Sequence, residues 1–278
     1  MPTDPPSPVT PSDLFLARDL SEQAAQDYLE TRGFRDPAAA DAHLQQLAED
    51  LPTRLALGDL ADLLLHSLAE AADPDAALVG LCRYVATRVP QSALIQYFHD
   101  DPRALDVLTT LLGASPFLSE VLIRSPEYFH WFQHELDTSV PDRVDYRVEL
   151  DRFLNHDPHF GRRLDALKRF KRREMLRIAG RDLLDKDTLR SSTQQLSTLA
   201  DVVIESAIDL VREQMATERN EFLPEPFVVI GMGKLGGGRA QLQLRCRPHL
   251  YLRRAGRCAY GNPPTISEAR PKADVDAQ

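Results

Sequence analysis

Helical periodicity runs through the chain from residue 13 to about residue 220. Apolar residues recur there at three- and four-residue steps, whereas strand-like alternation is almost absent. Prolines divide the region into separate helices, at Pro52, Pro74, Pro90 and Pro116. Ser115-Pro116 and Ser125-Pro126 each predict a helix capped by serine and entered through proline. The sequence therefore predicts a mainly α fold of packed helices.

Changes in composition and in hydrophobic periodicity along the chain predict five segments. The first is proline-rich and the last is basic, without helical or strand periodicity, so we expect both to be disordered. Between them lie two helical regions and a short strand-containing unit. The boundaries are 1–12 for the lead-in, 13–140 for the first helical region, 141–221 for the long helices, 222–238 for the strand-containing unit and 239–278 for the tail.

Charge and composition indicate where in the cell the protein is found and which classes of partner it does not bind. The net charge is −9 and the pI is about 5.4, and a diffuse negative field repels nucleic acid and acidic membranes. The longest apolar run, at about 60–68, is too short to span a bilayer, and the N-terminus has no signal-peptide pattern. The three cysteines form no CxxC pair. We expect a cytoplasmic protein that binds neither nucleic acid nor membrane.

One passage requires a chemical explanation. The β-branched run 227–230 predicts a buried strand, and it leads directly into Gly231-Met232-Gly233-Lys234-Leu235-Gly236-Gly237-Gly238. Glycines let backbone N–H groups approach an anion closely, and a lysine adds positive charge, so phosphate is the expected ligand. A GxGxxG dinucleotide site fits poorly, because no carboxylate follows before Glu268. A P-loop fits worse, and a plain structural turn explains one or two glycines more easily than five.

Three motifs, in the same order along the chain, resemble the glutamine synthetase adenylyltransferases, which belong to the polymerase-β-like nucleotidyltransferase superfamily. They are the residues 115–127, the residues 168–178 with 195–201, and the glycine loop. The resemblance implies that 222–238 begins a truncated α/β nucleotidyltransferase domain. The nucleotide-binding residues would be Gly231, Gly233, Lys234, Gly236 and Gly237.

The resemblance also implies an activity, cofactors and partners. The intact enzyme would attach AMP from ATP to a glutamine synthetase tyrosine, or remove it by phosphorolysis, as a multifunctional regulator of nitrogen metabolism. It would use Mg²⁺ with ATP or ADP, and its partners would be glutamine synthetase and a nitrogen-regulatory signalling protein. A helical protein-binding module without catalysis is the alternative.

The chain departs from the family after the glycines. The family continues Glu-Leu-Asn-aromatic-Ser-Ser-Asp-x-Asp, and its two aspartates, on one face of a strand, would hold the metal ions. This chain has Arg245 and Arg247 at those positions. Codons that spell 239–249 read Glu-Leu-Asn-Tyr-Ser-Ser-Asp-Val-Asp-Leu-Ile when they are shifted by one base. We therefore expect an N-terminal fragment with a frameshift after Gly238, in which no catalytic or metal-binding residues remain and no cofactor is supported.

The tail itself fits that interpretation. Residues 239–278 contain eight Lys or Arg and three Asp or Glu, within a chain that is acidic as a whole. A basic tail that binds nucleic acid is the competing interpretation.

Other candidate residues have simpler explanations. His130 and His134 lie four apart, but His-Trp-Phe-Gln-His lacks the glutamate of HExxH, so we expect ordinary boundary histidines. The basic stretch 162–181 is expected to be a solvated helix face. Within it, Arg173, Glu174 and Arg177 are site candidates only through the family resemblance.

Overall fold

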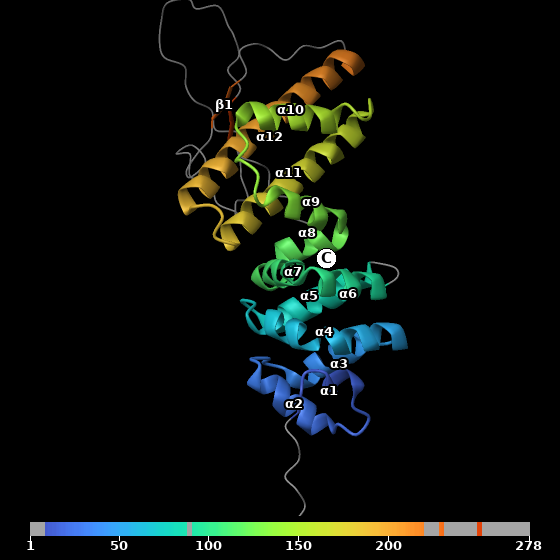
Figure 1. Ribbon diagram of the computed structural model, residues 1–278. Helices are drawn as coiled ribbons and strands as arrows, with labels where there is room; N and C mark the ends of the chain where they lie inside the picture. Colours follow the sequence, from blue (N-terminus) through green and yellow to red (C-terminus); the bar gives the residue numbers. More distant parts are fainter. Residues whose placement is uncertain (1–8, 88–90, 220–227, 231–248, 252–278) are drawn as a thin grey trace, which may run out of the picture.

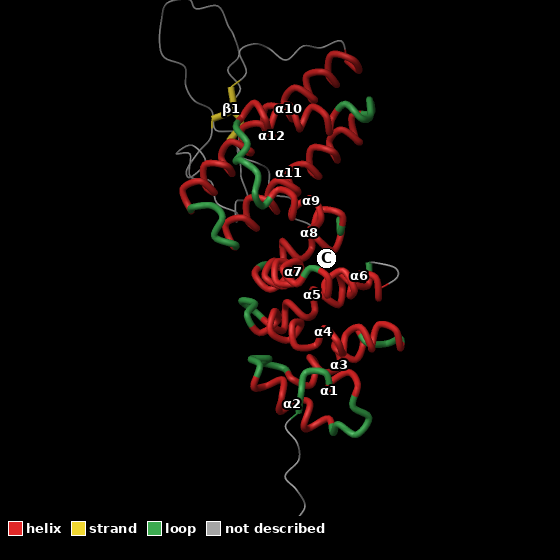
Figure 2. The backbone as a smooth tube through the Cα atoms, in the orientation of Figure 1, coloured by secondary structure: helices red, strands yellow, loops and turns green. Residues whose placement is uncertain are grey.

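The computed structural model describes residues 9–87, 91–219, 228–230 and 249–251. Within them the fold is mainly α, as predicted, and the helices stack into an elongated molecule (Figures 1 and 2). The first nine helices are α1 Asp13–Leu16, α2 Glu22–Thr31, α3 Pro37–Leu47, α4 Leu51–Ala69, α5 Pro74–Ala86, α6 Gln91–Asp100, α7 Pro102–Ala114, α8 Pro116–Arg124 and α9 Glu127–Glu135. Three longer helices follow, α10 Arg143–Leu154, α11 Phe160–Leu183 and α12 Leu189–Arg219.

Several helices begin at a capping side chain followed by proline. Asp36, Asp50 and Asp73 each accept a hydrogen bond from a backbone N–H of the first turn, which satisfies a donor that has no partner inside the helix. Ser115 caps α8 in the predicted way. The matching prediction for Ser125 is wrong, because Pro126 occupies the N-cap position of α9 and makes no side-chain cap.

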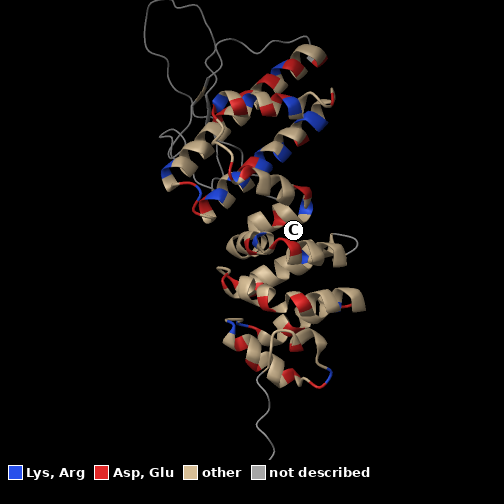
Figure 3. Cartoon of the chain, in the orientation of Figure 1, with Lys and Arg blue, Asp and Glu red and all other residues tan. Residues whose placement is uncertain are grey.

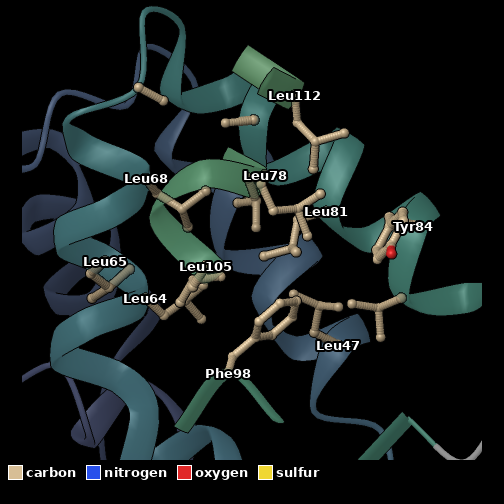
Figure 4. Close-up of a cluster of buried hydrophobic side chains, with 14 of the residues drawn as sticks. Leu47, Leu64, Leu65, Leu68, Leu78, Leu81, Tyr84, Phe98, Leu105 and Leu112 are labelled. Carbon is tan, nitrogen blue, oxygen red and sulfur yellow. The ribbon is translucent and has the colours of Figure 1, made fainter. Parts of the chain in front are cut away.

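Two clusters of buried apolar side chains hold the helices together. The first extends from Leu14 to Phe132, through α1–α9, and Figure 4 shows the part around Leu64, Leu81 and Phe98. The second lies among α10, α11 and α12, around Tyr146 and Phe170. Helix α11 contributes to both, because Leu176 and Ala179 join the first cluster and Phe170 and Ile178 the second. The long helix thus ties the two groups of helices into one structure.

After α12 the structure describes two short strands, β1 Val228–Ile230 and β2 His249–Tyr251, which pair antiparallel. Val229 lies opposite Leu250. β1 falls on the predicted strand, and its β-branched residues favour extended backbone. The tail 239–278 was expected to lack strands, yet its three described residues form β2. The rest of the tail and the lead-in 1–8 lie outside the described residues, where disorder stays a prediction.

Candidate functional site

The predicted glycine loop, with its nucleotide-binding residues and with Arg245 and Arg247 after it, lies outside the described residues. The structure describes only the strand that leads into the loop, since β1 ends at Ile230. The site that the described residues do form lies among α9, α10, α11 and α12.

Charged side chains lie buried inside this part of the molecule. Figure 3 shows charged residues of both signs along α10, α11 and α12. The expected solvated face of 162–181 is correct for Lys168, Arg169 and Arg172, which are exposed. It is wrong for Arg173, Glu174, Arg177 and Arg181, which are at most 8% exposed. Burying a charge is costly unless it is paired, so each of these four requires a partner.

Glu174 supplies the partner for two of the arginines. Its Oε1 accepts a hydrogen bond from Arg173 Nη2 at 2.8 Å, and its Oε2 accepts one from Arg177 Nε at 2.8 Å. The remaining positive charge is offset by Glu149 of α10, whose Oε1 lies 3.4 Å from Arg173 Nη2. The three residues that the family resemblance singled out are therefore brought together, as one ion-paired group on α11.

Aromatic rings enclose the Arg173 guanidinium. Its central carbon lies 4.4 Å from the ring centroid of Trp131 and 4.5 Å from that of Phe153. A cation over an aromatic face is attracted by the ring quadrupole, and the attraction is stronger away from water. Trp131 itself is partly buried and packs against the first cluster, with this guanidinium over its ring.

Arg177 adds a second link to α10 and extends the network to α12. Its Nη1 donates to Gln195 Oε1 of α12 at 3.1 Å, and its Nη2 donates to the Tyr146 hydroxyl of α10 at 2.5 Å. Burial raises the pKa of the Tyr146 phenol far above its ordinary value, so the phenol stays neutral. Burial alone lowers the pKa of Arg177, but Tyr146 and Glu174 leave it raised overall. The guanidinium is therefore a permanent charge.

Arg181 closes the end of α9. Its Nη1 donates to the backbone carbonyls of Glu135, Leu136 and Thr138, and its Nε donates to Asp187 Oδ2 at 2.8 Å. Burial raises the pKa of the Asp187 carboxyl, but hydrogen bonds from Arg181 and Gln195 hold it below its usual range. This arginine binds backbone carbonyls at the end of α9 and just after it, which is a structural role.

A cavity of about 350 Å³ opens beside the network. Its walls come from α9, α10, α11 and the segment before α10. The lining residues are Trp131, Glu135, Pro141, Asp145, Tyr146, Val148, Glu149, Arg152, Phe170, Arg173, Glu174 and Arg177. A concave site with aromatic walls and a few polar groups is the usual form of a ligand site.

Comparison with known proteins shows which family the chain resembles. The sequence model of glutamate-ammonia ligase adenylyltransferase matches residues 105–242, which include the buried network and the glycine loop. A bifunctional glutamine synthetase adenylyltransferase/adenylyl-removing enzyme of Thioalkalivibrio sulfidiphilus is 31% identical over 239 residues, 80% of this chain and 25% of the relative. The protein of the same name from Corynebacterium efficiens is 29% identical over 230 residues, 80% of this chain and 22% of its own length.

The chain belongs to the glutamine synthetase adenylyltransferase family. It spans about a quarter of the length of these curated relatives.

The positions at which the resemblance places the metal-binding aspartates lie outside the described residues. Arg245 and Arg247 stand where the resemblance places two aspartates, and a guanidinium has no lone pair to give a metal ion. Among the described residues, no three His, Cys, Asp or Glu side chains come together as a possible metal site. His130 and His134 therefore gain no third ligand there. In the same part of the chain, no helix is long and apolar enough to cross a membrane.

Sequence reasoning missed most of the network that this adenylyltransferase family member buries. Tyr146 and Glu149 were not singled out, Gln195 entered only as part of the family-like stretch 195–201, and Arg181 was counted among the solvated residues. A signal was present in the spacing, because Phe170, Glu174, Arg177 and Arg181 recur at steps of three or four, which is the spacing of a buried helix face.

Proposed function

We propose that this chain carries the helical region, and the start of the nucleotidyltransferase domain, of an enzyme that transfers adenylyl groups to or from glutamine synthetase in the cytoplasm. The observation that carries the proposal is the family match over 105–242, which contains Gly231-Met232-Gly233-Lys234-Leu235-Gly236-Gly237. The end of β1 directly before Gly231 supports it, because a strand leading into a glycine loop is a common phosphate-binding arrangement.

The chemistry would be a phosphoryl-type displacement. In attachment, a tyrosine oxygen of glutamine synthetase forms a bond to the α-phosphorus of ATP, the bond to the β-phosphate breaks, pyrophosphate leaves and the phenol proton passes to solvent. In removal, inorganic phosphate attacks the same phosphorus, the tyrosine oxygen leaves with a proton and ADP is released. Amides of Gly231, Gly233, Gly236 and Gly237, with Lys234, would hold phosphate oxygens. A nitrogen-regulatory signalling protein would control the balance between the two directions.

We further propose that the chain as written is inactive. Arg245 and Arg247 replace the two carboxylates that would hold Mg²⁺, so ATP or ADP would lack its usual counter-charge at the site. The proposed cause is one inserted base among the codons for Gly236, Gly237 and Gly238. The described helices would then belong to an enzyme whose codons for the metal-binding residues are out of frame.

The test compares two products of the gene. One is the 278-residue chain, and the other is made after one base is deleted from the glycine codons. Each is incubated with glutamine synthetase, Mg²⁺ and ATP labelled on the α-phosphate, and separately with adenylylated glutamine synthetase and phosphate. We expect no AMP transfer or release with the first product and metal-dependent transfer or release with the second.

Two results would contradict the proposal. One is transfer by the unaltered chain. The other is a restored product that neither binds ATP in the presence of Mg²⁺ nor acts on glutamine synthetase, which would favour the non-catalytic binding module.

A further inference from the structure

The cavity beside the buried network has more acidic than basic groups in its walls. Four carboxylates face three guanidinium groups there. The carboxylates belong to Glu135, Asp145, Glu149 and Glu174, and the guanidinium groups belong to Arg152, Arg173 and Arg177.

The basic side chains are already occupied by two of those carboxylates. Glu174 binds Arg173 and Arg177 at 2.8 Å each, and Glu149 Oε2 accepts from Arg152 Nη1 at 3.1 Å. An anion that entered the cavity would have to displace these carboxylates and would meet the two that remain. The charge distribution therefore disfavours an anionic ligand.

The two remaining carboxylates retain free acceptor capacity. Among the described residues, Glu135 and Asp145 form no ion pair. Glu135 Oε2 accepts from the Thr138 hydroxyl at 2.9 Å, and Asp145 Oδ2 accepts from the backbone N–H of Asp142 at 3.0 Å. An ionised carboxylate has about four lone-pair sites, so both groups can accept further hydrogen bonds from a ligand.

The rest of the wall suits a flat cation on an apolar stem. Trp131 is partly exposed and contributes aromatic surface beside the Arg173 guanidinium that lies over its ring, whereas the rings of Tyr146 and Phe170 are buried. Pro141 and Val148 contribute apolar surface, against which methylene groups can pack while the charged end reaches the carboxylates. A guanidinium matches this combination better than an ammonium, because it is planar and donates to two acceptors at once.

We propose that this cavity binds an alkylguanidinium group, with Glu135 and Asp145 as its acceptors. The group would come from an arginine side chain of a partner protein or from a free small guanidine. The proposal is independent of adenylyl transfer, because every residue that carries it lies in the described helices or in the segment before α10.

The chain's single tryptophan, Trp131, lines the cavity and so reports on its occupancy. The 278-residue protein is titrated with agmatine, a free alkylguanidine, and with N-acetyl-Ala-Arg-Ala-amide. A saturable change of tryptophan fluorescence in the millimolar range or below is expected. Binding of agmatine alone would indicate a free small guanidine, and binding of the peptide as well or more tightly would indicate a partner side chain.

Neutralising substitutions and an uncharged ligand analogue make the test specific. We expect Glu135→Gln and Asp145→Asn each to weaken binding about tenfold, because each loses a charge-assisted hydrogen bond. Glu49→Gln, an exposed substitution far from the cavity, is the control and should bind like the unaltered chain. The peptide with citrulline in place of arginine has the same shape without the charge, and it should not bind.

The citrulline comparison needs no protein variant, so it decides the question even if a substitution unfolds the protein. The proposal is overturned if neither guanidine gives a saturable change, if citrulline binds as well as arginine, or if AMP or phosphate binds at the cavity in their place.

Discussion

Arg177 Nε donates a hydrogen bond to Glu174 Oε2 at 2.8 Å, and the two side chains, one helical turn apart on α11, are both buried. Because Glu174 also binds Arg173, the carboxylate lies between two guanidinium groups. The other hydrogen bonds of Arg177 reach α10 through Tyr146 and α12 through Gln195. The pair therefore joins three helices at the point where the two apolar clusters meet.

Removing Arg177 should strongly destabilise the fold. Arg177→Ala leaves Glu174 buried with one partner fewer and leaves Tyr146 and Gln195 without a donor. Breaking a buried pair in this way costs about 3–5 kcal/mol. The free energy of unfolding, measured by urea denaturation, should fall by that amount. Arg172→Ala is the control, since Arg172 is exposed on the same helix and should change stability by less than about 0.5 kcal/mol. Equal effects of the two substitutions would refute a structural role for the network.

The close contact between α11 and α9 gives a second prediction. A Cβ on Gly180 would lie 2.4 Å from Phe132 Cζ, and the Phe132 ring is fully buried and cannot move away. Gly180→Ala should therefore destabilise the protein by about 1–3 kcal/mol, although alanine favours helix.

Gly161→Ala on the same helix is the matched control. A Cβ there meets nothing within 4 Å, so this substitution should leave thermal stability unchanged or raise it. A stabilising Gly180→Ala would show that the two helices do not approach this closely.

The cap of α5 should give stability that depends on pH. The backbone N–H of Ala76 donates to the Asp73 carboxylate at 3.0 Å, and this bond, with the Arg35 guanidinium, holds the pKa of Asp73 below its ordinary value of 3.8. A lowered pKa means that the cap stabilises the fold fully above the unfolded value and loses its effect as the pH falls through the folded value.

Asp73→Ala should accordingly cost about 1 kcal/mol at neutral pH, and the difference from the unaltered chain should vanish in strong acid. Urea denaturation at several pH values measures it, with Asp19→Ala, an exposed position, as the control. A difference that persists below the folded pKa would rule out the ionised cap as its cause.

The helices could be predicted from sequence because their signals are local. Periodicity, proline at the first turn and capping aspartate act within a few residues, so the divisions expected at Pro52, Pro74 and Pro116 coincide with the starts of α4, α5 and α8. The buried charges could not be predicted in this way. Whether Arg173 is solvated or enclosed depends on Trp131 and Phe153, which come from other helices. A hydropathy scale predicts that every arginine is exposed. Arg173 is buried because α9 and α10 pack against α11, and the sequence pattern of α11 alone does not show that packing.

Base-by-base sequencing of codons 236–249 in the source gene tests whether this chain carries the glycine loop of an adenylyltransferase whose next strand is out of frame. We predict that, read one base later, the codons of Arg245 and Arg247 become part of an Asp-x-Asp sequence that continues as an open frame. Codons that give no Asp-x-Asp in the shifted frame, or a stop codon directly after it, would contradict the account.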